Sequence, residues 1–281
     1  MHGNPILKTP NLDKLGKSSV QFKNFHVTPM CAPTRGELLT GLDNAVNQLS
    51  NVSSGRSLLK SGIPTMGNIF GSNGYSTGIF GKWGLGAPGS TSEPLKIGFD
   101  RFYGTIHGEG SFRDPSTLCR DNKMISPFAD GEYQPVDPYY YTDAISDQAA
   151  RFIRENPPGE PFFLYVAYTA AHWPLHARER DIARYQGRYN EGYQAIREAR
   201  LEEMNLVCGG KLDIQRSKAA GQWDAIHYKD WEAANMEVYA AMIDSMDQGI
   251  GRIINALKET GQFENTLLCY FQDNGGCAEA A

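Results

Sequence analysis

Lys82, His172 and the pair Asp273–Asn274 each stand at or just after the end of an apolar segment with strand composition. In an open α/β sheet, ligands bind in the crevice beyond the carboxyl ends of the strands. We therefore expect an ammonium group, an imidazole and two oxygen ligands, all distant in sequence, to converge on one sheet edge. A histidine there can exchange protons near neutral pH, and carboxylate and amide oxygens are typical calcium ligands.

A further reactive group stands in Cys31-Ala32-Pro33-Thr34-Arg35, a C-x-P-x-R segment that is followed by Leu39-Thr40-Gly41. Taken alone, C-x-P-x-R favours a short helix start with a structural cysteine, because a free cysteine is commonly a small buried hydrophobic residue. The L-T-G triplet at a fixed distance, together with the motifs described below, favours a functional cysteine instead.

The segments around these residues alternate between strand and helix character, which favours an α/β fold with a largely parallel sheet. Helices are predicted at 9–15, 64–74, 142–156 and 230–260, and strands at 20–25, 75–82, 162–168 and 265–271. Thr142 is expected to cap the helix that it begins. The helix at 230–260 carries a long apolar stripe, which indicates packing on the sheet.

Composition limits the function classes. The 281 residues can form one large domain or two smaller ones, and we expect a single domain over residues 1–281. The net charge is −5 and the lysines and arginines are scattered, so we expect no nucleic-acid partner. No apolar run has the length of a membrane span. The first residues lack the pattern of a signal peptide. This absence is uninformative, because the start resembles an internal segment of the fold.

The chain has five cysteines, an odd number without metal-type spacing, and no disulfide is predicted from them. They are Cys31, Cys119, Cys208, Cys269 and Cys277. Cys269 lies in an apolar strand pattern and is expected in the core.

The Cys31 segment resembles the sequence that marks the nucleophile of the sulfatase family, whose arylsulfatase-like members belong to the alkaline-phosphatase-like superfamily. Other family blocks follow in the family's order along nearly the whole chain: Lys8–Asp13, Gly74–Gly78, Gly81–Gly86, Gly98–Asp100 and Ala171–Leu175. The resemblance implies an α/β fold in which helices flank both faces of a large, mostly parallel mixed sheet.

The resemblance also implies a reaction, the hydrolysis of an aryl or carbohydrate sulfate monoester. Cys31 would be oxidised to formylglycine by a separate formylglycine-generating enzyme, and the aldehyde hydrate would attack sulfur. Arg35, one helical turn later, would hold the hydrate. Lys82 would bind a sulfate oxygen as a point charge, and His172 would bind sulfate or protonate the leaving oxygen.

Asp273, Asn274 and the hydrate at Cys31 would bind Ca²⁺ in such an enzyme. Asp-Asn-Gly is also a common turn signature, so the triplet alone does not decide. The family's histidine two residues after the lysine is replaced here by Gly84. His107, in a loop shortly after, could substitute in binding the substrate; the alternative is a solvated loop histidine.

Three further family features are expected to be missing from this chain. They are a first strand with paired metal-binding aspartates, a lysine beyond the Asp-Asn-Gly triplet and a smaller C-terminal domain. Without the aspartates, most calcium ligands are unaccounted for, so activity at this length is expected to be low or absent. Localisation is undetermined, and periplasmic or secreted for full-length relatives.

Two alternatives stay open. One is a phosphohydrolase of the same superfamily, and the other is a non-catalytic remnant that binds sulfated glycans. The expected partner is a sulfated small molecule or glycan. Trp83, Trp173 and the tyrosines at 139–141 could line an aryl or sugar pocket, although core packing fits most of them equally well.

Overall fold

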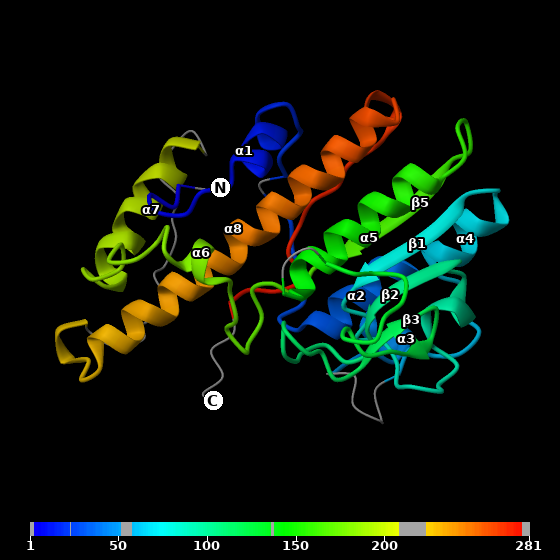
Figure 1. Cartoon of the computed structure of the whole chain (residues 1–281), viewed down its shortest axis with the longest axis horizontal. Coiled ribbons are helices and arrows are strands. Elements are labelled where there is room, and N and C mark those ends of the chain that lie inside the picture. Colours follow the sequence, from blue (N-terminus) through cyan, green and yellow to red (C-terminus); the bar gives the residue numbers. More distant parts are fainter. Residues whose placement is uncertain (1–2, 23, 52–57, 136–137, 208–222, 277–281) are drawn as a thin grey trace. The chain divides into compact units, whose positions relative to one another are not determined.

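The computed structural model (Figure 1) describes residues 3–22, 24–51, 58–135, 138–207 and 223–276. The chain divides into two compact units. One comprises Met1–Phe25 and Leu175–Gln248, and the other comprises His26–Pro174 and Gly249–Ala281. Helix α8 (Lys229–Glu259) contributes to both units, so the single domain expected over 1–281 stays a prediction.

The second unit holds a five-stranded sheet in the order β4-β3-β2-β1-β5. Strand β1 (Ser76–Gly81) pairs in parallel with both β2 (Arg101–Thr105) and β5 (Phe162–Ala167). The short strands β3 (Leu118–Arg120) and β4 (Lys123–Met124) add antiparallel pairs at one edge. The predicted α/β fold with a mixed sheet built around parallel strands is confirmed.

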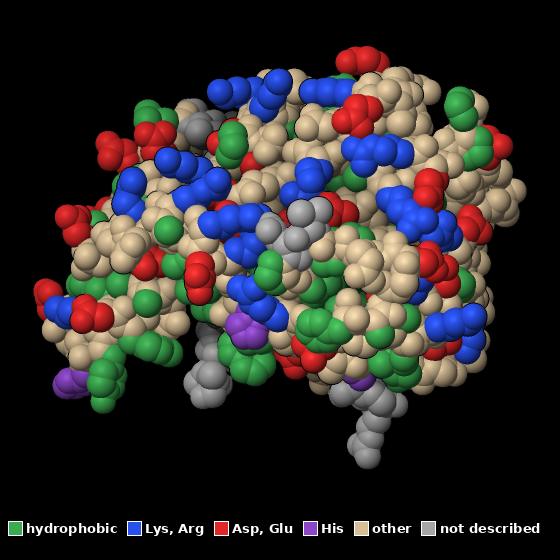
Figure 2. All heavy atoms as spheres, viewed as in Figure 1, with side chains coloured by type: hydrophobic (Ala, Val, Ile, Leu, Met, Phe, Trp, Pro, Cys, Tyr) green, Lys and Arg blue, Asp and Glu red, His purple; other side chains and the backbone are tan. Residues whose placement is uncertain are grey.

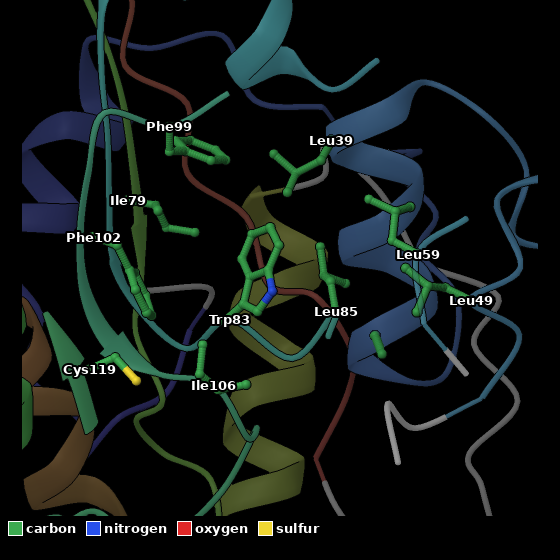
Figure 3. Close-up of a cluster of buried hydrophobic side chains, with 11 residues drawn as sticks. Leu39, Leu49, Leu59, Ile79, Trp83, Leu85, Phe99, Phe102, Ile106 and Cys119 are labelled. Carbon is green, nitrogen blue, oxygen red and sulfur yellow. The ribbon is translucent and has the colours of Figure 1, made fainter. Parts of the chain in front are cut away.

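Helices cover both faces of the sheet, because successive residues of β1 point to opposite sides. Phe80 packs on Phe152 of α5 (Tyr141–Glu155), with ring centroids 5.7 Å apart. Its neighbour Ile79 instead joins a buried cluster that includes Leu39 of α2 (Cys31–Thr40), as Figure 3 shows. The α2 helix, with Cys31 at its start, is thus fixed to the sheet by core packing.

The remaining elements are short or lie in the first unit. They are α1 (Pro10–Lys17), α3 (Asn44–Asn47), α4 (Met66–Ser72), α6 (Glu179–Ile182), α7 (Tyr193–Val207) and the 3₁₀ turns Pro94–Ile97, Trp223–Ala225 and Phe263–Asn265. Helix α4 begins with a capping box between Thr65 and Asn68. None of the described helices combines the length and apolar character needed to cross a membrane.

In the first unit, a carboxylate from α8 caps the start of α1. Thr9, at the N-cap position, makes no side-chain capping bond. Instead the backbone N–H groups of Asn11 and Leu12 donate to the buried Asp247 carboxylate at 3.0 and 2.8 Å. The carboxylate thereby satisfies donors that a helix start leaves open.

A second buried carboxylate, Asp181 of α6, joins the same α8 helix. It accepts hydrogen bonds from Arg178, Ser245 and Gln248. Burial raises the pKa of Asp181, but the hydrogen bonds from Gln248 and Arg178 outweigh burial and hold it below its ordinary value. These carboxylates tie the short elements of this unit to one long helix.

The strands predicted at 20–25 and 265–271 are wrong for the described residues. Val20 and Leu267 are 83% and 90% exposed, and no described strand pairs with either segment. Apolar composition makes a segment compatible with a strand, but a strand exists only where a neighbour completes its hydrogen bonds. Cys269 is exposed for the same reason, in contrast to the expected core position.

Two smaller expectations meet different outcomes. Helix α5 begins one residue earlier than predicted, with Tyr140 at the N-cap, so Thr142 lies inside the helix and does not cap it. Cys31, Cys119 and Cys269 are free thiols. Cys208 and Cys277 lie outside the described residues.

Replacing Asp247 with alanine should leave the first N–H groups of α1 without an acceptor in a buried setting. We expect Asp247→Ala to lower the free energy of unfolding by about 2–4 kcal/mol, measured by urea denaturation. Asp43→Ala removes the exposed cap of α3, which accepts from Ala45 at 2.8 Å, and should cost only about 1 kcal/mol. Equal losses in the two variants would contradict the long-range capping role.

Candidate active site

The structure places Cys31 as the first residue of α2, half-buried and with a free thiol. Met30 occupies the N-cap and makes no side-chain capping bond. The L-T-G triplet at the other end positions the helix: Leu39 is buried in the core, and Gly41 ends the helix with φ 67°, a conformation that favours glycine. The cysteine is therefore presented at a helix start whose far end is anchored.

Arg35 brings three separate segments together. Its guanidinium is almost fully buried and donates from Nε to the Trp83 carbonyl at 3.1 Å, and also to the Lys82 carbonyl. Its Nη1 lies 3.8 Å from Oδ2 of Asp273. The α2 helix, the end of β1 and the Asp273 segment thus meet around one cation.

The structure adds a residue to this group that the sequence did not single out, Tyr165 of β5. The Arg35 guanidinium carbon lies 5.2 Å from the centre of the Tyr165 ring. Burial raises the pKa of Tyr165, and the charge of Arg35 partly offsets this rise. The charges of Asp273 and Cys31 raise the same pKa further. The strand register, in which Tyr165 is the neighbour of Ile79, is the signal that could have found it.

Lys82 directly follows β1, and its N–H donates to the Ala167 carbonyl of β5 at 2.8 Å. Gly81 before it has φ 117°, and a Cβ there would lie 2.0 Å from that carbonyl oxygen, so only glycine fits the turn. The Lys82 residue is 3% exposed, yet its ammonium forms no hydrogen bond or ion pair with any described residue. A buried cation without a counter-charge favours binding of an anion.

The position of Gly84 connects Lys82 with His107. The Gly84 N–H donates to the Ile106 carbonyl at 3.0 Å, and His107 directly follows Ile106 in the chain. A Cβ on Gly108 would lie 3.1 Å from Nζ of Lys82, which brings the loop backbone close to the ammonium. The His107 residue itself is exposed.

His172 lies in the segment after β5, where its N–H donates to the Thr169 carbonyl at 2.8 Å. Nδ1 of its ring lies 2.7 Å from the Trp173 carbonyl oxygen. A carbonyl only accepts, so Nδ1 carries a proton and Nε2 is the nitrogen that can exchange one. Lys82 and His172 follow neighbouring strands, although no described hydrogen bond joins their side chains.

The residues expected to bind calcium do not make a complete site. Asp273 faces Arg35, and the Asn274 amide donates to the Gly275 carbonyl at 2.7 Å. Among the described residues, no group of three or more His, Cys, Asp or Glu side chains is arranged to hold a metal ion. Calcium takes roughly six to eight oxygen ligands, so two side chains and residue 31 leave most of its coordination unfilled.

Most of the candidate aromatic residues belong to the core. Trp83 is fully buried in the cluster of Figure 3 and donates from Nε1 to the Ser92 carbonyl at 2.8 Å. The tyrosines at 139–141 are buried too. These residues therefore do not line an open pocket. Trp173, which is 51% exposed beside His172, stays a candidate for contact with a ring.

Charged side chains of both signs are interspersed on the face that Figure 2 shows. This agrees with the scattered lysines and arginines of the sequence. In the described site, the positively charged residues Arg35 and Lys82 are instead buried.

The structure thus brings Arg35, on the helix that Cys31 begins, to the backbone at the end of β1, where the buried Lys82 follows the strand. The family model described as Sulfatase matches residues 1–280, and the chain belongs to the sulfatase family. It is 32% identical to an arylsulfatase of Klebsiella aerogenes, over 96% of this chain and 61% of that protein.

Solved structures share the fold. The crystal structure of Ps i-CgsB in complex with k-i-k-neocarrahexaose has a TM-score of 0.67 at 24% identity, covering 94% of this chain and 52% of that one. The structure of BT4656 in complex with its substrate D-glucosamine-2-N,6-O-disulfate has a TM-score of 0.64 at 20% identity, covering 93% and 59%. The chain thus spans little more than half the length of the relatives that it matches.

Replacing the unpartnered Lys82 with methionine removes a buried charge but keeps the side-chain volume. We expect Lys82→Met to leave the free energy of unfolding unchanged or to raise it by about 1 kcal/mol, in sulfate-free buffer. Lys96→Met is the control: it breaks a partly exposed ion pair with Glu93, at 2.9 Å, and should cost at most about 1 kcal/mol. A loss well above that in Lys82→Met would show that the ammonium is already neutralised.

Proposed function

We propose that this chain is the nucleophile-bearing part of a sulfuric ester hydrolase, an arylsulfatase-like enzyme that cleaves sulfate monoesters. The observation that carries the proposal is the buried Lys82 ammonium, which has no counter-charge among the described residues, beside the Arg35 guanidinium at the start of the Cys31 helix. Two buried cationic residues near the helix that a half-buried cysteine begins suit an anionic ester better than a neutral substrate.

The reaction needs a nucleophile at sulfur, cations around the sulfate oxygens and a proton for the leaving oxygen. Formylglycine derived from Cys31 would supply the nucleophilic hydroxyl. Arg35 is held by the carbonyls of Lys82 and Trp83, so its guanidinium stays beside the first turn of α2 and orients residue 31. Lys82 takes a sulfate oxygen as a point charge.

His172 supplies the proton for the leaving oxygen. With Nδ1 directed at the Trp173 carbonyl, Nε2 is the donor once the ring is protonated. His107 contributes to substrate binding from the loop next to Lys82, close to Gly84, the position at which the family pattern is expected to have a histidine. Each role rests on the placement of these residues around one sheet edge.

The substrate class is an aryl or sugar sulfate. The support is the arylsulfatase among the relatives, the disulfated glucosamine in one similar structure, and the exposed Trp173 ring beside His172. Maturation by a formylglycine-generating enzyme is required, because a thiol at position 31 cannot supply the hydroxyl chemistry.

The decisive test combines maturation with turnover. The chain is co-expressed with a formylglycine-generating enzyme, the peptide around Cys31 is weighed by mass spectrometry, and sulfate release from an aryl sulfate is measured. We expect the aldehyde mass at residue 31 and a low sulfatase rate, which Cys31→Ala abolishes and Lys82→Met lowers at least ~100-fold.

Other outcomes separate the alternatives. A persistent thiol without sulfate release contradicts the proposal. Phosphodiester turnover that exceeds sulfate release identifies a phosphohydrolase. Complete conversion to the aldehyde without turnover, but with retention on a sulfated glycan column, identifies a non-catalytic binder.

Asp273, Asn274 and residue 31 would hold the calcium ion of this proposal, but these residues alone should bind it weakly. We expect 5 mM CaCl₂ to raise the melting temperature by less than ~1 °C, since a ligand stabilises only in proportion to its occupancy of the folded state. Asp273→Ala serves as the reference without the carboxylate. A rise of several degrees that disappears in Asp273→Ala would contradict this expectation and reveal further ligands.

A further inference from the structure

Arg35 is fixed in two directions by different parts of the second unit. Its edge is held by the carbonyls of Lys82 and Trp83, which follow β1. Its face is covered by the Tyr165 ring, whose centre is 5.2 Å from the guanidinium carbon. Edge hydrogen bonds alone leave a planar group free to tilt, and a stacked ring removes that freedom.

Tyr165 is itself held rigidly. It lies within β5, paired with Ile79 of β1, and packs against the buried cluster on the α2 side of the sheet. A residue on a paired strand has little freedom to move relative to the sheet. The ring therefore has a fixed position and restricts the orientation of the guanidinium.

The hydroxyl of Tyr165 also takes part in this group. The charge of Arg35 lowers the pKa of this hydroxyl, whereas the charges of Asp273 and Cys31 raise it. The phenol is thus close to the reactive end of α2 while its ring packs with the core. A purely structural core residue would not need to share its surroundings with all three of these site residues.

We propose that Tyr165 is a positioning residue that fixes the Arg35 guanidinium beside residue 31, a role that rests on the proposed sulfatase function. The ring provides this effect through its contact with the guanidinium. Removing the ring should let the guanidinium tilt away from residue 31, and a displacement of about 1 Å at a catalytic group can cost on the order of a hundredfold in rate.

The first measurement follows Arg35 directly and needs no turnover. The ¹H–¹⁵N resonance of Arg35 Nε, assigned with Arg35→Lys, reports ring-current shift and hydrogen exchange in the full chain. We expect Tyr165→Leu to remove the ring-current shift and to speed exchange at least ~tenfold, while Tyr165→Phe keeps both near the original values. If Tyr165→Leu does not fold, Tyr165→Met, which keeps more of the side-chain volume, takes its place.

The chain offers a matched control in Tyr103. This buried tyrosine covers Arg120, with the guanidinium carbon 4.9 Å from its ring centre, on the other neighbour of β1. Tyr103→Leu should loosen Arg120 and leave the Arg35 resonance unchanged. An Arg35 resonance with its original shift and protection in Tyr165→Leu would overturn the proposal.

The second measurement uses the matured chain and an aryl sulfate. We expect Tyr165→Leu to lower kcat at least ~tenfold with KM within ~threefold, and Tyr165→Phe to restore kcat to within ~threefold. An unchanged kcat in Tyr165→Leu overturns the positioning role even though the enzyme is active. If Tyr165→Leu loosens Arg35 but the matured wild-type chain has no sulfatase activity, the positioning of Arg35 by Tyr165 is upheld and the proposed function is refuted.

Discussion

The hydrogen bonds from Arg35 to the carbonyls of Lys82 and Trp83 are the interaction on which the described site depends. They join the start of α2 to the end of β1 through a buried charged group, and charged hydrogen bonds of this kind are stronger than neutral ones. The same cation approaches Asp273 and stacks on Tyr165. One side chain therefore connects the α2 helix, the backbone at Lys82 and the Asp273 carboxylate.

Glycine makes this close approach possible. Gly81 and Gly104 face each other across β1 and β2 so tightly that a Cβ on Gly104 would lie 1.8 Å from the Gly81 carbonyl oxygen. Beyond this contact, the Lys82 side chain lies close to the backbone of the loop at Gly108. The site is thus built from short backbone distances as much as from charged side chains, which explains why glycines punctuate the sequence around Lys82.

Local patterns predicted the elements that are stabilised locally. The α5 and α8 helices and the β1 and β5 strands follow from periodicity, whereas the length of α2 and the contacts of Arg35 were not predicted from it. The failures share a cause: strand formation at 20–25 and 265–271, and the place of Tyr165, depend on which segment lies alongside. Local patterns in a single sequence do not show which strands pair or in which register.

The bond between Asp247 and the start of α1 spans 236 positions of the chain. During synthesis on a ribosome, α1 leaves the exit tunnel long before its acceptor has been translated. The first turn of this helix therefore lacks its acceptor until more than half of α8 has emerged. Because contacts so distant in sequence form slowly, assembly of this unit is a late event in folding, and the nascent first helix is an exposed target for chaperones until then.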